Sequence, residues 1–316
     1  MQFKKDFSGR DFLSLYDYSK NDLSYFMDLA DFLKAEKKAG RPIDYLRGKT
    51  LGMIFEKSST RTRVSFETGI YYLGGTGLFL SSQDIQLGRG EPLCDTARVM
   101  TRYVDGLMIR TFAHENVEEL AKYADIPVIN GLTDLLHPCQ VLADLLTIRQ
   151  HKGTLSGLKM VFLGDGSSNM ANSLMLGAAK MGLDIVIASA DGYSPSPNIY
   201  QLALSCAAES GAKIELTADP FAAVKSADVL YTDVWASMGQ EEEQQKRQRD
   251  LSPFQINQTI LAAAKKDAVV MHCLPAKRGQ EITDEVMESP QSIVFDQAEN
   301  RLWAQMAVMA SLMCDK

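Results

Sequence analysis

The sequence predicts an α/β protein of two doubly wound domains, each with a mainly parallel sheet flanked by helices. Its 316 residues suggest two domains, at roughly 150 residues per domain. Short apolar runs of strand length alternate with stretches of helical periodicity, which is typical of βαβ units. This alternation restarts after the segment His-Lys-Gly-Thr at 151–154. We therefore expect one domain at 1–150 and a second at 151–297.

The expected elements of the first domain follow the spacing of its apolar residues. From Ser19 to about Lys38 these residues fall on one helical face, and Gly40 ends the helix. Four apolar runs predict strands at Thr50–Phe55, Thr76–Leu80, Gly106–Ile109 and Pro127–Asn130. Two further periodic stretches predict helices at Thr60–Leu73 and His137–Gln150.

The second domain repeats the pattern with five apolar runs. These predict strands at Met160–Leu163, Ile185–Ala188, Lys213–Leu216, Val229–Thr232 and Ala268–Met271. Helices are expected at Met170–Met181 and Tyr200–Ala212. The charge run from Glu241 to Arg249 is typical of a solvated helix or loop. Ligands of such sheets bind beyond the carboxyl ends of the strands.

Composition and charge exclude several classes of protein. A hydrophobic content of 46% argues against intrinsic disorder, and a formal charge of −7 argues against a nucleic-acid or anionic-membrane binder. The five cysteines lack CxxC spacing and the four histidines are far apart, so neither a disulfide framework nor a metal centre is expected. We find no secretory signal at the N-terminus and no apolar run of membrane-spanning length. These features predict a reduced, cytoplasmic protein without a metal.

Hydroxyl and guanidinium groups follow the first predicted strand, in the segment Ser59-Thr60-Arg61-Thr62-Arg63. A helix start has free backbone N–H groups and the positive end of the helix dipole. The planar fork of Arg61 suits a phosphate, so the segment predicts an anion site. A simple N-cap followed by surface arginines explains the same residues about equally well.

Two other polar groupings lie at the ends of predicted elements. His137 and Gln140 are three residues apart at a helix start, so both can reach one ligand's carbonyl oxygen and amide nitrogen. Cys273 and Asp233 each follow a predicted strand, where a doubly wound sheet binds its ligand. The simpler interpretations are a hydrogen-bonded histidine at a helix end and an inert buried thiol.

The segment Gly-Asp-Gly-Ser-Ser-Asn at 164–169 is similar to a dinucleotide-binding turn. It lacks the third glycine of that motif, and no acidic residue stands in clear register for a ribose. A nicotinamide-dependent dehydrogenase therefore stays open as an alternative function, which a failure to bind NAD would exclude.

Four motifs then occur in one order along the chain. They are FEKSSTRTR (55–63), HPCQ (137–140), DVWASMG (233–239) and HCLP (272–275), with DTARV (95–99) and ENR (299–301) as further markers. Together they resemble the aspartate/ornithine carbamoyltransferase family, from about residue 5 to the C-terminus. The combination of Asp233 with the SMG turn is similar to the members that use ornithine.

The resemblance implies an activity and an organisation. A carbamoyl group would pass from carbamoyl phosphate to the δ-amine of L-ornithine, giving citrulline and phosphate without any cofactor. The domain at 1–150 would bind carbamoyl phosphate, with a C-terminal helix at about 298–316 packing back on it, and the domain at 151–297 would bind ornithine. A homotrimer or an assembly of trimers is expected, because the family's mobile loop, here carrying Gln86, reaches a neighbouring subunit.

The resemblance also assigns roles to individual residues. Those expected to bind carbamoyl phosphate are Ser59, Thr60, Arg61, Thr62, Gln86, Arg110, His137, Gln140, Cys273, Leu274 and Arg301. Those expected to bind ornithine are Asn169, Asp233, Ser237 and Met238. The residues with catalytic roles would be Cys273, Arg110, His137 and Asp233. After ENR the chain reads Leu-Trp-Ala-Gln at 302–305, where many relatives carry Met-His, so the local packing of that helix is expected to differ.

The implied chemistry requires a neutral amine. The δ-amine of ornithine has a pKa of ~10.4 in water, close to that of lysine, so most of it is protonated at neutral pH. Once deprotonated, the amine attacks the carbonyl carbon directly, and the leaving phosphate can accept its proton. We therefore expect Cys273 and Asp233 to position the amine as a polar pair rather than to form an acyl intermediate. A trapped carbamoyl thioester on Cys273 would contradict this hypothesis.

Alternative acceptors stay open within the family. Putrescine carries no α-carboxylate for the SMG turn to bind, and N-acylated ornithine is associated with a bulky insertion that this chain lacks. Aspartate would require basic residues for two carboxylates in place of the SMG turn. A catalytically silent binding subunit is a further alternative, although all the motif residues are present.

Overall fold

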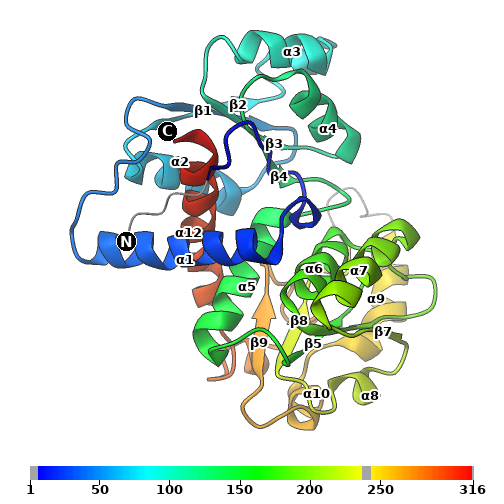
Figure 1. Ribbon diagram of the computed structural model, residues 1–316. Helices are drawn as coiled ribbons and strands as arrows, with labels where there is room; N and C mark the ends of the chain where they lie inside the picture. The colour runs from blue at the N-terminus through cyan, green and yellow to red at the C-terminus, as the bar shows by residue number, and fades with distance from the viewer. Residues whose placement is uncertain (1–5, 237–242, 315–316) are drawn as a thin grey trace. The chain divides into compact units, whose positions relative to one another are not determined.

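The computed structural model describes residues 6–236 and 243–314 and divides the chain into two compact units (Figure 1). Unit 1 comprises Met1–Ala143 and Glu299–Lys316, and unit 2 comprises Asp144–Ala298. Two helices contribute residues to both units, α5 (Pro138–Lys152) and α12 (Val294–Met313). The sequence pattern places a boundary after the first of these helices, whereas the division by contacts falls inside it.

Unit 1 is built on a four-stranded sheet in the order β2-β1-β3-β4. All three neighbouring pairs are parallel, which confirms the predicted fold class for this part of the chain. The central strands are apolar and almost completely buried, as strands covered by helices on both faces must be. The strands are β1 (Thr50–Phe55), β2 (Thr76–Ser81), β3 (Gly106–Arg110) and β4 (Val128–Leu132).

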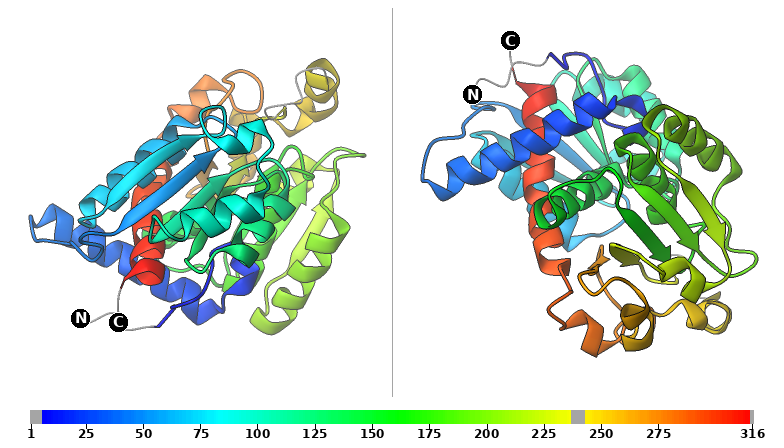
Figure 2. Two further views of the ribbon diagram at one scale, coloured as in Figure 1. Left: turned by 90° about the horizontal axis from the view of Figure 1, so that it is seen from above. Right: turned by 60° about the horizontal axis from the view of Figure 1, so that its bottom comes forward.

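The helices of unit 1 pack against this sheet (Figure 1). They are α1 (Lys20–Lys38), α2 (Thr60–Tyr72), α3 (Leu93–Met100) and α4 (His114–Tyr123), with short 3-10 helices η1 (Leu15–Asp17) and η2 (Gln86–Arg89). Residues of α3 and α4, including Ala97 and Leu120, form a core with Ile54 and Leu107 of the strands. Figure 2 shows α12 in red, and its methionines Met306 and Met309 lie against Gly69 of α2.

A bulge interrupts the pairing of β3 with β4 beside a predicted site residue. Ile109 pairs with Asn130 but Arg110 pairs with Leu132, so Gly131 is one residue in excess. A Cβ atom at Gly131 would clash with the sulfur of Met108 and lie 3.1 Å from the backbone oxygen of Ile109, so a larger residue here would have to displace the methionine side chain. Because a bulge bends its strand and redirects side chains, it sets the direction in which Arg110 leaves the sheet.

Unit 2 is built on a five-stranded sheet in the order β7-β6-β5-β8-β9. Every neighbouring pair is again parallel, and the order reverses between β5 and β8, as in a doubly wound fold. The predicted fold class is therefore confirmed in this unit as well. The strands are β5 (Lys159–Leu163), β6 (Asp184–Ala188), β7 (Ile214–Thr217), β8 (Val229–Thr232) and β9 (Val269–His272).

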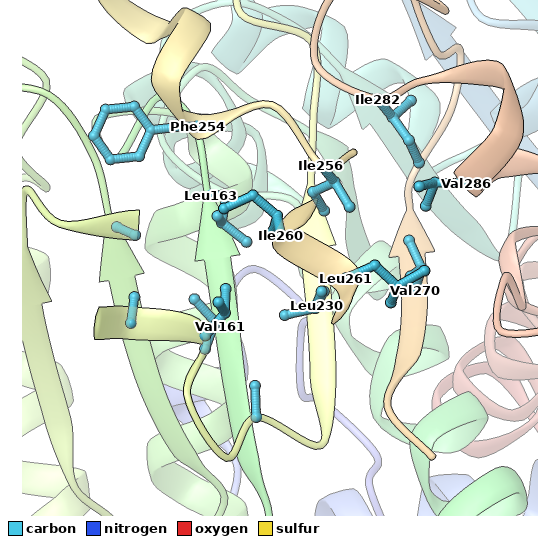
Figure 3. Close-up of a cluster of buried hydrophobic side chains, with 14 of the residues drawn as sticks. Val161, Leu163, Leu230, Phe254, Ile256, Ile260, Leu261, Val270, Ile282 and Val286 are labelled. Atoms are coloured by element: carbon cyan, nitrogen blue, oxygen red, sulfur yellow. The ribbon is translucent and has the colours of Figure 1, made fainter. Parts of the chain in front are cut away.

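Alternate side chains of these strands face a buried apolar cluster (Figure 3). Leu163, Leu230 and Val270 come from three neighbouring strands, and Phe254 and Ile260 come from the helical segments that cover them. The helices of the unit are α6 (Asn169–Met181), α7 (Pro197–Ser210), α8 (Pro220–Val224), α9 (Gln244–Leu251), η4 (Ser252–Phe254), α10 (Gln258–Ala263) and α11 (Asp284–Met287).

The helix starts follow local capping chemistry. Ser19 accepts a hydrogen bond from the backbone N–H of Asp22, and the carboxylate of Asp22 accepts one from the backbone of Ser19, so the two form a capping box. Pro197 opens α7 three residues earlier than apolar periodicity predicts, because proline fits the first turn of a helix. No helix in the described ranges is long and apolar enough to cross a membrane.

The buried cluster of unit 2 provides a stability prediction. Leu230→Ala removes a fully buried side chain and leaves a cavity, so the free energy of unfolding should fall by about 2–5 kcal/mol. The shift of the urea unfolding transition measures this loss. Leu216→Ala is the control, because Leu216 is 41% exposed on the edge strand β7 and its removal should cost less than about 0.5 kcal/mol. Equal losses in the two variants would contradict the packing described.

Candidate functional site

Several motif residues lie where the strand order of each sheet reverses, whereas His137 and Cys273 follow the edge strands β4 and β9. In unit 1 the segment 59–62 follows β1 and Arg110 ends β3, and these two strands are neighbours from which the chain continues in opposite directions. In unit 2 the segment 164–169 follows β5 and Asp233 follows β8, which flank the reversal there. A ligand crevice opens at such positions, beyond the carboxyl ends of the strands.

The phosphate motif of unit 1 forms the first turn of α2. Ser59 is the N-cap, and its hydroxyl accepts from the backbone N–H of Thr62 at 3.2 Å. Thr60 is exposed at the first helical position and Arg61 is half-buried. The N-cap interpretation of the sequence is therefore correct for Ser59, and it is compatible with anion binding because other N–H groups of the first turn lack partners within the helix.

Two arginines converge on the hydroxyl of Thr62, which is itself buried. Arg110 donates from Nη1 at 3.5 Å and Arg301 donates from Nη2 at 3.2 Å. Arg301 also donates from Nη1 to the side-chain oxygen of Gln140 at 2.6 Å. Residues from β3, α2, α5 and α12 thus meet in one place, and all four are among those that the resemblance assigns to carbamoyl phosphate.

Gln305 is a member of this group that sequence reasoning missed. With its amide oriented to satisfy both ends, its oxygen accepts from Nε of Arg301 at 3.1 Å and its nitrogen donates to Ser65 at 2.6 Å. Gln305 lies four residues after Arg301 on α12, so the two share a helical face. This spacing from Arg301 is the sequence feature that could have indicated Gln305. Gln305 ends the segment 302–305, where we expected the local packing of the helix to differ from that of many relatives.

His137 is buried beside this cluster as a neutral imidazole. Burial lowers its pKa well below the usual value of 6.5, and the positive charges of Arg301, Arg110 and Arg61 lower it further. A neutral ring carries one N–H donor and one acceptor. It can therefore donate a hydrogen bond to a carbonyl oxygen, but it adds no positive charge near neutral pH.

The remaining polar residues near the motif differ in their surroundings. Arg63 pairs with Glu67 at 3.1 Å and lies 3.6 Å above the ring of Phe79, so it is held on the outer face of α2. Gln86 is exposed on η2, and within the described part of the chain its side chain makes no hydrogen bond to this cluster. The structure therefore separates Arg61 and Arg63, which the sequence motif alone does not.

In unit 2 a thiol and a carboxylate meet at the ends of two neighbouring strands. The thiol of Cys273, after β9, donates to Oδ1 of Asp233, after β8, at 3.0 Å. The backbone N–H of Val234 donates to the same oxygen at 2.8 Å. Burial raises the pKa of Asp233 above its usual range, and the nearby His272 and the Cys273 thiol oppose that rise. The expected pairing of Cys273 with Asp233 is present within this unit.

A buried histidine and glutamate hold the turn that carries Cys273. Nδ1 of His272 accepts from the backbone N–H of Leu274 at 2.9 Å, and Nε2 contacts Oε1 of Glu281 at 3.1 Å. Leu274 has a φ of 59°, in the left-handed region that a branched residue rarely adopts. The His272–Glu281 pair therefore supports a strained backbone position directly after Cys273.

Asp233, His272 and Cys273 form the one group in the described ranges whose spacing could suit a metal. Ligand atoms of Asp233, His272 and Cys273 lie within 4.8 Å of one another. Both ring nitrogens of His272 are occupied by Leu274 and Glu281, however, so the group offers two ligands rather than the three or four that a zinc site uses. The arrangement fits a polar pair better than a metal centre.

The glycine-containing turn after β5 is organised by its own aspartate. Oδ1 of Asp165 accepts from Ser167, and Oδ2 accepts from Nη1 of Arg247 at 2.5 Å. Asn169 is half-buried at the first position of α6. Arg247 also donates to the backbone oxygen of Trp235 at 3.3 Å and is buried, so the description of the charge run as solvated is wrong at this residue. The buried carboxylate of Asp165 attracts it inward.

Two residues expected to bind ornithine, Ser237 and Met238, lie outside the described residues. The structure describes the chain on either side of them. Arg247 contacts Trp235 before this segment and Glu243 after it, the latter at 3.0 Å. Sequence reasoning missed Arg247, because a charge run gives no indication of which member has a buried partner.

Comparisons with known proteins match nearly the whole length of the chain to a single family. Residues 10–150 match the model described as aspartate/ornithine carbamoyltransferase, carbamoyl-P binding domain, and residues 156–312 match the corresponding Asp/Orn binding domain. The chain is 61% identical over 312 residues to an ornithine carbamoyltransferase of Oceanobacillus iheyensis, covering 99% of this chain and 97% of the relative. It is 56% identical to that of Thermococcus kodakarensis, covering 97% of each.

Solved structures agree with these relatives. The ornithine carbamoyltransferase from Pyrococcus furiosus superposes with a TM-score of 0.95 at 53% identity, covering 98% of this chain and 99% of that one. The one from Gloeobacter violaceus gives a TM-score of 0.87 at 47% identity, covering 98% of this chain and 100% of that one. With two domain models matched in order and full-length relatives above half identity, the chain belongs to the aspartate/ornithine carbamoyltransferase family.

Proposed function

We propose that this protein transfers the carbamoyl group of carbamoyl phosphate to the δ-amine of L-ornithine, giving L-citrulline and phosphate. The observation that carries the proposal is the contact between Asp233 and Cys273, together with the SMG segment that follows Asp233 in the sequence. The chain is also at least 56% identical to two ornithine carbamoyltransferases over nearly its full length. The dehydrogenase alternative receives no such support, because the turn at 164–169 lacks the third glycine of the dinucleotide-binding motif.

The arginine cluster of unit 1 supports binding of the anionic donor. Arg110 and Arg301 both donate to the hydroxyl of Thr62, and Arg301 also donates to the amide oxygen of Gln140, so these hydrogen bonds orient the two guanidinium groups. Backbone N–H groups at the start of α2 add donors for a phosphate. We assign Ser59, Thr60, Arg61 and Thr62 to this phosphate.

Neutral His137 suits the carbonyl end of the donor. During attack by the amine the carbonyl oxygen gains negative charge, and preorganised donors stabilise that charge in the transition state. Arg110, His137 and the hydroxyl of Thr62 are donors of this kind.

The polar pair of unit 2 supports binding of the amine. A protonated δ-amine is attracted to the Asp233 carboxylate, whose raised pKa reflects a poorly solvated position. Release of one proton to solvent gives the neutral amine, which forms the new C–N bond as the C–O bond to phosphate breaks. The departing phosphate can take up the second proton that the nitrogen loses, so the proposed route includes no acyl-enzyme.

The direct test is citrulline formation from carbamoyl phosphate and candidate acceptors. Ornithine should have the highest kcat/KM among ornithine, putrescine, N-acetylornithine and aspartate, since only ornithine offers a δ-amine together with the free α-amino acid group expected at Asn169, Ser237 and Met238. A higher kcat/KM for any other acceptor would replace the proposed substrate. No turnover with any of them would favour a silent binding subunit.

Arg61→Ala should lower kcat/KM for carbamoyl phosphate by about 10²–10³-fold, the loss typical of one charged donor to a reacting anion. Steady-state citrulline assays measure the change. Arg63→Ala is the matched control, two residues along the same helix, because its guanidinium is held by Glu67 and Phe79. A comparable loss in the Arg63 variant would show that the motif acts through general charge rather than through Arg61.

The depressed pKa of His137 predicts a pH-dependent stability. The unfolded chain gains a proton on this histidine below pH 6.5, whereas the folded chain keeps it neutral to a much lower pH. The contribution of His137 to stability is therefore lost as the pH falls below about 6.5, by up to about 1.4 kcal/mol per pH unit. Between about pH 7.5 and pH 5.5 the wild type should lose more unfolding free energy in urea than His137→Gln. Parallel pH dependences in the two proteins would disprove a neutral buried imidazole.

We also propose that the chain forms homotrimers or assemblies of trimers, with Gln86 contributing to a neighbouring subunit. Support comes from apolar side chains left exposed in the single chain, Val64 (53%) and Tyr71 (73%) of α2 and Leu78 (43%) of the edge strand β2. Edge strands and apolar helix faces are usually covered. Light scattering should give a mass that is a multiple of three chains, and a monomer would refute the proposal.

We also propose that the protein is located in a reducing compartment, the cytoplasm. All five cysteines are free, including Cys314, which is exposed. Exposed thiols persist as thiols in reducing compartments, where disulfides are rare. Alkylation of the protein in intact cells, followed by mass spectrometry, would detect any disulfide that contradicts this location.

A further inference from the structure

The outer edge of strand β9 is completed by the segment that leads into α12. Strand β9 lies at the edge of its sheet and pairs with β8 on one side. On the other side Val270 donates to the backbone oxygen of Gln291 at 2.8 Å and accepts from Ile293 at 3.0 Å. Two residues further along β9, a side chain takes over this role. The N–H of His272 donates to the side-chain oxygen of Gln297 at 2.9 Å.

Buried groups on the opposite side fix the orientation of the Gln297 amide. Its nitrogen donates to Oδ1 of Asp144 at 2.7 Å and to the hydroxyl of Tyr231 at 3.0 Å. The Tyr231 hydroxyl donates to Oδ2 of Asp144 at 3.0 Å. Burial and the neighbouring Asp144 raise the pKa of Tyr231 well above 10, so its hydroxyl stays a donor. An amide, with an acceptor at one end and donors at the other, is the group that fits here.

This network reaches the candidate site from both neighbouring strands. His272 directly precedes Cys273 at the end of β9, and Tyr231 stands two residues before Asp233 on β8. Gln297 contacts both strands, so it fixes the end of one relative to the end of the other. The 3.0 Å contact between the Cys273 thiol and the Asp233 carboxylate lies directly beyond it. All four network residues are almost completely buried, so water does not compete for these bonds.

We propose that Gln297 is a positioning residue for the carbamoyl transfer, acting through the backbone of His272 to place the thiol of Cys273 against Asp233. This inference rests on the proposed function but concerns a residue outside all four sequence motifs. Its hydrogen-bond partners in the described part of the chain are residues that we assign to no substrate. Its effect is on where Cys273 lies, and small displacements of positioned groups are costly to catalysis.

The test compares two substitutions at Gln297 with a matched control. Gln297→Leu removes both hydrogen-bonding ends, and Gln297→Glu keeps the shape but places a carboxylate against Asp144. Gln291→Leu is the control, because Gln291 also supports β9 through a side-chain bond, to the backbone oxygen of Ala268 at 2.8 Å, at the amino end of the strand. The urea transition of each variant confirms that it folds.

The first measurement is steady-state kinetics. In Gln297→Leu, kcat/KM for ornithine should fall by about tenfold or more, because Cys273 moves away from Asp233, the carboxylate that we expect to hold the amine. Gln291→Leu should behave as the wild type. Equal losses in the Gln297→Leu and Gln291→Leu proteins, or none in either, would overturn the inference.

The second measurement is the pH profile of Gln297→Glu relative to the wild type. The groups facing position 297 are Asp144 from α5 and Tyr231 from β8, with His272 and Cys273 beyond the bonded backbone of β9. At lower pH the protonated carboxyl group of this variant can donate to Asp144 and still accept from His272. The loss of kcat/KM for ornithine relative to the wild type should therefore shrink as the pH falls. A loss that does not change with pH overturns the proposed orientation of the Gln297 amide, and this comparison serves as the test of Gln297 if Gln297→Leu fails to fold.

The third measurement is independent of turnover. Alkylation of Cys273 by iodoacetamide, followed on its own peptide by mass spectrometry, should be about threefold faster or more in Gln297→Leu, because the thiol is released from Asp233. Cys94, in unit 1, is the internal reference. An unchanged alkylation rate for Cys273 overturns the positioning role of Gln297, whether or not the wild type makes citrulline. Absence of citrulline formation by the wild type would separately refute the proposed function.

Discussion

Parallel pairing throughout both sheets is the constraint on which the site depends. All seven neighbouring strand pairs in the described residues are parallel, so the carboxyl ends of all strands in a sheet lie at one edge. Residues as distant in sequence as Thr62 and Arg110 therefore meet at the end of one sheet, and Asp233 and Cys273 at the end of the other. An antiparallel strand in either position would carry its following loop to the opposite edge.

Neutral groups orient a charged side chain in each unit. In unit 1, Arg301 donates hydrogen bonds to the side chains of Thr62, Gln140 and Gln305. In unit 2, the carboxylate of Asp233 accepts hydrogen bonds from a thiol and a backbone N–H. Under the proposed function, the arginine would face the anionic donor and the carboxylate would face the cationic amine.

Local chemistry accounts for what the sequence could predict. The N-cap at Ser59 and the strand ends before Asp233 and Cys273 depend on neighbouring residues, so periodicity and motif spacing were enough to place them. The partners of these residues depend on contacts across the fold. Gln297 has no motif, and its hydrogen-bond partners Asp144 and His272 stand 153 and 25 residues away. Amides of this kind become informative only when the folded chain shows which buried donors and acceptors they join.

Buried amides join donors and acceptors around both groups of candidate site residues without adding a charge. Gln140, Gln297 and Gln305 each supply an acceptor to one neighbour, and Gln297 and Gln305 supply a donor to another. A glutamate in these positions would add a negative charge beside Arg301 or Asp144, and an aliphatic residue would leave buried donors unsatisfied. Glutamine satisfies both ends without changing the net charge. These amides thus orient charged neighbours through neutral side chains, and the proposed function would use those charges to bind the substrates.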